Sequence, residues 1–210
     1  MPQFVLMRKL LMLVVLLICL SPTASKAQSV SELNTLRRIN PNNPNSAIWN
    51  NLSNTSKYIS VGIPVVYFAA GLMHNNKEFK QKAAYTAASI LLNTASTTLL
   101  KNVVKRERPY HTYTGIFPDK IKSDYGFPSG HTSSAFATAT SLAISTKKWY
   151  VAVPAFAWSA SVGYSRIYLG QHYPSDVIMG ALVGSSSALI CHWASKQLLK
   201  RKKSKPIPLK

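Results

Sequence analysis

Five stretches of this chain contain no charged side chain, and they constrain its fold more than any other feature. The stretches cover residues 58–73, 83–100, 132–146, 149–165 and 177–195. A helix rises about 1.5 Å per residue and the bilayer core is about 30 Å thick, so a spanning helix needs about 20 residues. A soluble helix would carry charges on its solvent-facing side. We therefore expect an all-α, membrane-embedded helical bundle with five spans.

A soluble helical bundle is the competing interpretation. Some of the stretches are shorter than the usual minimum of about 17 residues for a spanning helix. Ser, Thr and Asn93 dilute them, and the mean hydropathy of the chain is only just positive. Length and composition alone therefore leave both kinds of bundle open, and the absence of charge favours the membrane.

The N-terminus has the pattern of an export signal. Arg8 and Lys9 precede an apolar run over residues 10–20, and Ala27 ends a short segment of small residues where cleavage is expected. We therefore expect a signal peptide over residues 1–27; if it is retained as an anchor, the bundle has six spans.

The rest of the chain divides into three parts. The polar segment 28–57 is expected to be periplasmic and exposed, with an amphipathic piece around Leu36. Residues 58–195 form the predicted membrane domain, and 196–210 a basic cytoplasmic tail.

The position of the basic residues indicates how the bundle is oriented. The formal net charge is +19, but the Lys and Arg residues lie in the links between the apolar stretches, which is unlike the basic face of a nucleic-acid-binding protein. The links around residues 77–82 and 147–148, together with the tail, fall on one side of the predicted bundle. The positive-inside rule makes that side cytoplasmic. Loops 101–127 and 166–174, on the other side, are also basic, which a site for an anionic substrate explains.

Acidic residues are scarce, which limits the chemistry. The chain has six Asp and Glu residues, and Asp176 is the only one after Asp124. Magnesium and calcium need several oxygen ligands, and zinc sites need three or four Cys, His or carboxylate ligands. The sequence shows neither set. We therefore expect metal-free chemistry and no cofactor.

The first cluster of reactive residues follows the second uncharged stretch. Lys101 and Arg108 are seven residues apart, so two helical turns place them on the same side. Pro109 disfavours a helical conformation for Arg108 and marks the exit from the helix. Alone, the segment could also be a basic flank of a membrane helix, together with Lys105 and Arg106.

The second cluster comprises Pro128, Ser129, Gly130 and His131. Pro and Gly impose a turn, and an uncharged helix begins at once. Free backbone N–H groups and the positive end of the helix dipole then meet at one point, which suits an anion. Ser129 can equally be a plain N-cap residue. His131 could donate a proton to a leaving oxygen.

The third cluster comprises Ser165, Arg166, His172 and Asp176. The guanidinium of Arg166 matches two phosphate oxygens at once. Asp176 can hold one ring N–H of His172 and leave the lone pair of the other nitrogen exposed, as a nucleophile requires. A lone histidine at a helix end is usually structural, but this one is expected to face two Arg, one Lys and a second His.

These clusters resemble, in order and without a departure, the three signature motifs of the type-2 phosphatidic acid phosphatase superfamily. That superfamily also contains bacterial acid phosphatases and vanadium haloperoxidases. The resemblance covers roughly residues 58–195. It implies that His172 attacks phosphorus, that Asp176 orients it and that His131 protonates the leaving group. It also implies a set of groups that hold the phosphate oxygens: Lys101, Arg108, Ser129, Gly130 and Arg166.

The function we expect is removal of phosphate from a lipid phosphate or pyrophosphate at the periplasmic face of a bacterial inner membrane. The alternatives are a soluble exported acid phosphatase and a non-catalytic membrane protein that binds an anionic headgroup. By resemblance, the candidate lipids are undecaprenyl pyrophosphate, phosphatidylglycerol phosphate, phosphatidic acid and lipid A. The sequence does not choose among them. Nor does it fix the oligomeric state, because the small residues Gly180, Gly184 and Ala188 could pack within one chain or between two.

Overall fold

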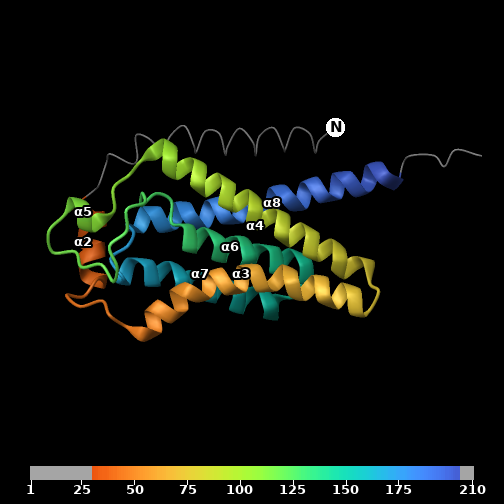
Figure 1. Ribbon diagram of the computed structural model, residues 1–210, viewed down its shortest axis with the longest axis horizontal. Coiled ribbons are helices and arrows are strands. Elements are labelled where there is room, and N and C mark those ends of the chain that lie inside the picture. The colour runs from red at the N-terminus through yellow and green to blue at the C-terminus, as the bar shows by residue number, and fades with distance from the viewer. Residues whose placement is uncertain (1–29, 204–210) are drawn as a thin grey trace, which may run out of the picture.

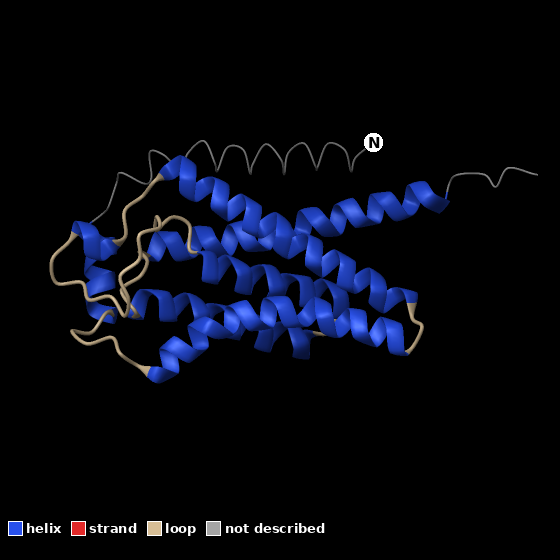
Figure 2. Ribbon diagram, viewed as in Figure 1, coloured by secondary structure: helices blue, strands red, loops and turns tan. Residues whose placement is uncertain are grey.

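The computed structural model describes residues 30–203, and every element of regular structure in this range is a helix (Figure 2). Five long helices form the bundle: α3 (Ala47–Met73), α4 (Lys77–Val104), α6 (Gly130–Thr146), α7 (Trp149–Tyr168) and α8 (Pro174–Lys203). The short helices α2 (Val30–Ile39) and α5 (Pro109–Thr112) lie at one end of the bundle with the long loops (Figure 1). The all-α prediction is confirmed. The predicted signal peptide lies outside the described residues.

Each uncharged stretch lies within one long helix, as predicted. The boundaries follow from local chemistry. At the start of α4, for example, Asn76 Oδ1 accepts hydrogen bonds from the backbone N–H groups of Glu78 (2.8 Å) and Phe79 (3.4 Å). The helix ends where Lys105 adopts a left-handed conformation with φ of 50°.

The segment before the bundle differs from our expectation of an exposed polar stretch. The amphipathic piece is the helix α2, and Leu36 on it is fully buried. Helix α3 begins at Ala47 rather than near Tyr58, and its first turns bury Ser53 and Ser56. The absence of charge could not reveal this start, because the first turns of α3 are polar and pack against other parts of the chain.

Helix α6 is the centre of the bundle and contacts α3, α4, α7 and α8. Small polar side chains join it to its neighbours. Ser60 Oγ on α3 lies 2.8 Å from Thr138 Oγ1, and Ser159 Oγ on α7 donates to the carbonyl oxygen of Ala135 at 2.9 Å. Small residues let the helix backbones come close, and their hydroxyl groups bond across the contacts.

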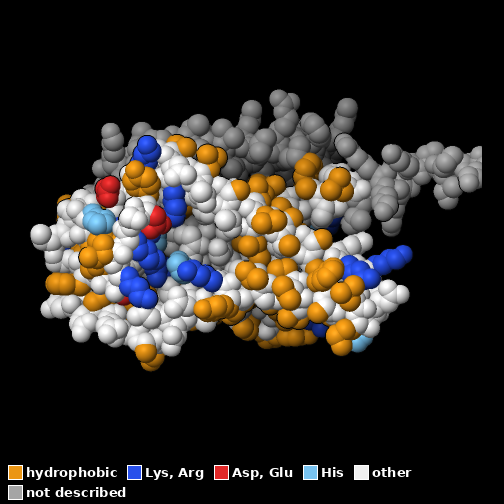
Figure 3. All heavy atoms as spheres, viewed as in Figure 1, with side chains coloured by type: hydrophobic (Ala, Val, Ile, Leu, Met, Phe, Trp, Pro, Cys, Tyr) orange, Lys and Arg blue, Asp and Glu red, His pale blue; other side chains and the backbone are white. Residues whose placement is uncertain are grey.

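Large hydrophobic side chains point outward instead. They include Val61, Val65, Val66 and Phe68 on α3, Leu91 and Leu99 on α4, Val153 and Phe156 on α7, and Ile178 and Leu182 on α8. In the face that Figure 3 shows, hydrophobic side chains cover the middle of the bundle, whereas Lys and Arg gather toward its two ends. A soluble bundle would place its large apolar residues inside. The distribution therefore favours a bundle surrounded by lipid.

Among the described helices, α3 and the part of α8 over Pro174–Leu198 are long and apolar enough to cross a membrane. That α4, α6 and α7 also cross remains a prediction. The α3–α4 and α6–α7 turns lie at the end of the bundle away from α2 and α5 (Figure 1). Lys82, Lys147 and Lys196 line one opening there. The basic links thus share an end, as predicted, and its cytoplasmic location remains a prediction.

The ridge of small residues on α8 packs within the chain, against α6. A Cβ atom added at Gly180 would lie 2.7 Å from the carbonyl oxygen of Ser129, and one added at Gly184 would overlap the carbonyl oxygen of Ser133. These glycines therefore set the distance between α6, whose first turn carries His131, and α8, whose first turn carries Asp176.

We expect Gly184→Ala to destabilise the protein by about 1–3 kcal/mol, the usual cost of overpacking a tight contact. Gly62→Ala is the matched control, because nothing lies within 4 Å of a Cβ added at Gly62 on α3. Thermal unfolding in detergent measures both. Equal melting temperatures for the two variants would contradict the close contact between α6 and α8.

Candidate active site

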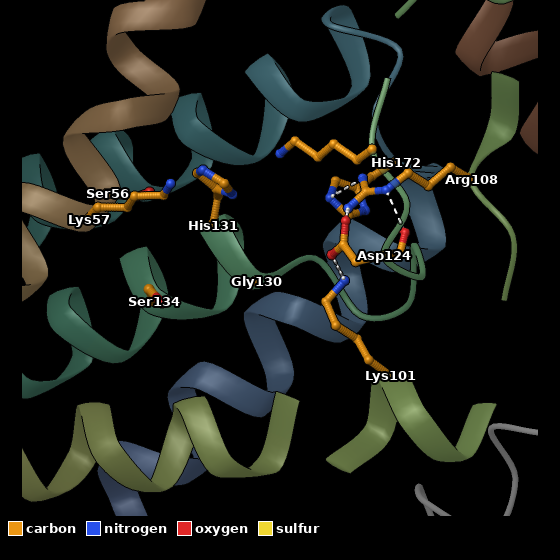
Figure 4. Close-up of a pocket in the computed structure, with 10 residues that line it drawn as sticks. Ser56, Lys57, Lys101, Arg108, Asp124, Gly130, His131, Ser134 and His172 are labelled. Atoms are coloured by element: carbon orange, nitrogen blue, oxygen red, sulfur yellow. Dashed lines mark hydrogen bonds and ion pairs between the residues drawn. The ribbon is translucent and has the colours of Figure 1, made fainter. Parts of the chain in front are cut away.

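The three sequence clusters meet at one cavity of about 260 Å³. Five of the predicted site residues line it: Lys101, Arg108, Gly130, His131 and His172. Figure 4 shows His131 on one side of this space, and Arg108 and His172 on the other. Two of these predicted residues, Lys101 and His172, are 71 positions apart in the sequence and share one small space.

Hydrogen bonds between backbone and side-chain groups hold the clusters together. The N–H of Ser129 donates to the carbonyl oxygen of Asp176 at 3.0 Å, which joins the second cluster to the third. Arg108 Nη1 donates to the carbonyl oxygen of Gln171 (2.9 Å) and to its side-chain Oε1 (3.1 Å), which joins the first cluster to the third. Gln171 Nε2 in turn donates to Asp119 Oδ1 at 2.7 Å. The relative positions of the clusters are therefore fixed by direct contacts.

His172 lies at the centre of this arrangement and is 2% exposed. Its Nδ1 is 3.6 Å from Asp176 Oδ2, and its Nε2 is 3.3 Å from Arg108 Nη1. Burial, followed by the positive charges of Arg108 and Arg166, holds the pKa of His172 well below its usual value. The ring is therefore neutral at physiological pH, and a neutral imidazole has the lone pair that a nucleophile needs.

Asp176 is fully buried behind His172 and does not line the cavity. Its Oδ2 accepts a hydrogen bond from the backbone N–H of Tyr173 at 2.9 Å, and its Oδ1 accepts one from Arg106 Nη1 at 2.6 Å. The contact of 3.6 Å with His172 is longer than a hydrogen bond, and such contacts commonly tighten when substrate binds. The carboxylate is positioned to orient the imidazole ring.

Arg166 and Ser129 are also buried next to the cavity. Arg166 Nη1 donates to Ser53 Oγ at 2.7 Å, while its Nε and Nη2 find no partner among the described residues. Buried guanidinium donors without a partner suit an anion. Ser129 occupies the N-cap position of α6, but its hydroxyl makes no capping bond and lies 2.9 Å from Thr132 Oγ1. The plain N-cap interpretation therefore does not account for this hydroxyl.

Asp124, which sequence analysis did not assign to the site, neutralises two of the predicted phosphate ligands. Its Oδ1 is 2.7 Å from Arg108 Nη2, and its Oδ2 is 3.1 Å from Lys101 Nζ. Burial of Asp124 raises its pKa, but Arg108 and Lys101 outweigh that effect and hold the pKa below its usual value. With its side chain 53% exposed, this carboxylate occupies the position that an oxyanion bound to both cations would take.

Two further cations, Lys57 and Lys122, line the cavity and were missed by sequence analysis. The backbone of Lys122 is held by Tyr110, whose hydroxyl accepts from its N–H at 2.9 Å and lies 3.3 Å from its carbonyl oxygen. Burial and the charges of Arg166 and Arg108 lower the pKa of Lys122 to about 8. Its loop position carries no sequence signal beyond general basicity.

Within residues 30–203, no three His, Cys, Asp or Glu side chains come together in the way a metal ion requires. The acidic side chain at the cavity, Asp124, is bound to cations instead. Metal-independent chemistry remains a prediction that a chelator can test.

Comparison with known proteins places this geometry in context. The PAP2 superfamily matches residues 82–200. A lipid A 4'-phosphatase of Bacteroides thetaiotaomicron is 24% identical over 190 residues, which is 85% of this chain and 84% of that protein. An undecaprenyl-diphosphatase of Sulfolobus acidocaldarius is 35% identical over 86 residues, but the match covers only 40% of this chain and 41% of that protein. The crystal structure of Aquifex aeolicus LpxE superposes with a TM-score of 0.64 at 24% identity, over 79% of this chain and 96% of that one, which shows a shared fold.

We expect Asp124→Asn to strengthen the binding of inorganic phosphate by about tenfold, because the anion no longer competes with a carboxylate for Lys101 and Arg108. Isothermal titration of the detergent-purified protein measures this change. Glu107→Gln removes a carboxylate from an exposed neighbouring position and is the matched control. Weaker binding in Asp124→Asn alone would show that Asp124 positions the cations rather than competing for them.

We expect phosphate binding to weaken by about tenfold as the pH rises through about 8, because Lys122 then loses its charge. In Lys122→Arg the loss should move to higher pH, since guanidinium stays protonated. Lys120→Arg, at an exposed position, is the control. Identical pH profiles for the Lys122→Arg variant and the unchanged protein would exclude Lys122 from the binding site.

Proposed function

The chain belongs to the PAP2 superfamily, and we propose that it is a membrane phosphatase that hydrolyses a lipid phosphate or diphosphate through a covalent intermediate on His172. One observation carries the proposal. The buried imidazole of His172, whose pKa is lowered well below its usual value, lines a small cavity together with Lys101, Arg108 and Lys122. A second histidine, His131, lines the same cavity.

In the first step, His172 Nε2 attacks phosphorus and the bond from phosphorus to the leaving oxygen breaks. The electron pair goes to that oxygen, which takes a proton from His131. Lys101 and Arg108 hold the non-bridging oxygens, and the free donors of Arg166 lie nearby. Charge stabilisation and positioning carry the catalysis, as in phosphoryl transfer generally.

In the second step, water attacks the phosphohistidine, the phosphorus–nitrogen bond breaks, and His131 takes the proton from the water.

His131 can serve both steps because its protonation state changes when the substrate binds. Burial and the charges of Arg166, Lys122 and Lys57 lower its pKa when the cavity holds no anion. A bound phosphate brings negative charge next to these cations, which opposes that effect and favours the protonated, acidic form.

A lipid substrate is favoured by the position of the cavity. It lies at one end of a bundle whose sides carry large apolar residues (Figure 3), so a substrate anchored in the bilayer would present its headgroup there. The similar proteins named above include a lipid A 4'-phosphatase and an undecaprenyl-diphosphatase. We infer that the cavity faces the periplasm of a bacterial inner membrane, opposite the basic links.

Lys57 and Lys122 add charge beyond the three motifs. Figure 4 shows Lys57 beside His131, away from Arg108 and His172. This is the side on which the leaving group would lie, because His131 protonates it. A leaving group that carries its own negative charge, as in a diphosphate, would contact Lys57. Lys57→Ala is therefore the variant that should alter the preference between monoesters and diphosphates.

The test is phosphate release by the detergent-purified protein from a panel of lipid and water-soluble phosphates, with a chelator present. We expect turnover of lipid phosphates to persist with chelator. His172→Asn should lower the rate by about a thousandfold or more and leave phosphate binding intact, because the cations remain.

The outcomes separate the alternatives. Full turnover by His172→Asn would exclude this nucleophile, and loss of activity with chelator would exclude metal-independent chemistry. A protein that enters the aqueous phase without detergent and prefers soluble esters would be the exported acid phosphatase. Phosphate binding without release from any substrate would indicate a headgroup-binding protein.

A further inference from the structure

Helix α2 lies across the catalytic end of the bundle and is docked at both of its ends. Leu36 is fully buried and packs in one hydrophobic cluster with Ile116, Ile167 and Tyr173. At the C-terminal end, Asn40 Nδ2 donates to the carbonyl oxygens of Phe117 (2.9 Å) and Tyr168 (2.8 Å). The N–H of Phe117 donates back to Asn40 Oδ1 at 2.8 Å. The helix is thereby held in one place relative to the site.

The first turn of α2 places Glu32 against the segment that carries Asp176. Glu32 Oε1 accepts hydrogen bonds from the backbone N–H of Ser175, at 2.9 Å, and from its hydroxyl group. Glu32 Oε2 lies 3.1 Å from Arg106 Nη2. The carboxylate is only 11% exposed, so these contacts form away from bulk water.

Arg106 passes this interaction on to Asp176. The same guanidinium that meets Glu32 through Nη2 meets Asp176 Oδ1 through Nη1, at 2.6 Å. Its Nη1 also donates to Ser175 Oγ at 2.7 Å, and its face stacks on the ring of Tyr173, 4.1 Å from the ring centre. Arg106 is thus fixed between two carboxylates from distant parts of the chain.

We propose that Glu32 and Arg106 are positioning residues for the reaction: α2 contacts Arg106 through Glu32, and Arg106 in turn holds Asp176 in place behind His172, in a cluster whose net charge is negative. The inference rests on the proposed function, in which His172 is the nucleophile. Neither residue lines the cavity, so both act through Asp176 rather than by touching the substrate.

The physical reason is the charge balance of a buried cluster. Arg106 alone would neutralise Asp176 and weaken its hold on the Nδ1–H of His172. With Glu32 included, one positive and two negative charges leave a net negative charge behind the imidazole. That charge favours the positive ring that forms when Nε2 bonds to phosphorus, and such effects are strong where water is excluded.

The experiment compares Glu32→Gln with the unchanged full-length protein in detergent, using p-nitrophenyl phosphate. Gln keeps the size of Glu32 and can still accept from Ser175, but it lacks the charge. We expect kcat to fall by about 10- to 100-fold, the range typical of outer groups that orient a reactive one. KM should stay within about twofold, because the cavity is unaltered. Glu107→Gln is the matched control, an exposed carboxylate next to Arg106 in sequence, and should leave kcat unchanged.

A second variant tests the route through Arg106. Lysine reaches one carboxylate rather than two, so Arg106→Lys should lower kcat as well, and the double variant should be little worse than either single one. An unchanged kcat in Glu32→Gln would overturn the inference. A lower rate that is fully explained by a smaller fraction of folded protein would overturn it too. If Arg106→Lys fails to fold, Glu32→Gln decides alone. Absence of turnover by the unchanged protein would instead overturn the proposed function, and this inference with it.

Discussion

The cations around His172 repel one another, and much of the structure serves to hold them together. Lys101, Arg108 and Lys122 line one small cavity, and Arg166 is buried beside it, so their mutual repulsion is stronger than it would be in bulk water. Asp124 offsets part of the repulsion, and the carbonyl oxygen of Gln171 takes up another donor. Packing of the helices that carry these groups offsets the rest of the repulsion. A phosphate dianion would reduce this repulsion, so the cavity is expected to favour an anion.

The bundle buries many serine and threonine residues and exposes large apolar ones, unlike a typical soluble protein. The buried polar contacts hold the helices that carry the site in place. Serine and threonine residues fill the contacts of α6, so the helices approach closely and their hydroxyls bond across the interfaces. Gly180 and Gly184 allow α8 to lie directly against α6. The helix ends that carry His131 and Asp176 are therefore positioned by close contacts between α6 and α8, while the large apolar residues remain on the outside. The same arrangement is compatible with a membrane bundle in spite of an overall hydropathy near zero.

The sequence predicted the elements that have a regular signal. Absence of charge predicted the five long helices, and the motif spacing predicted Lys101, Arg108, Gly130, His131 and His172, all of which line the cavity. Contacts between distant segments could not be predicted in this way. Glu32 meets Ser175 across 143 positions, and Ser53 meets Arg166 across 113. Lys57 and Lys122 reach the cavity because of where α3 begins and how one loop folds, and neither follows from local propensity.

The division of labour along the chain follows from these contacts. The family match, residues 82–200, contains the three motifs, and with them the groups that we propose contact phosphorus and its oxygens. Glu32, on α2, and Ser53 and Lys57, on α3, lie before the matched part. Glu32 contacts Arg106, which contacts Asp176, and Ser53 accepts a hydrogen bond from Arg166. Lys57 lines the cavity on the side next to His131. In the proposed mechanism, the residues that take part in the chemistry therefore lie in the matched part. The residues of α2 and α3 would influence how firmly His172 is positioned and which leaving group fits beside His131.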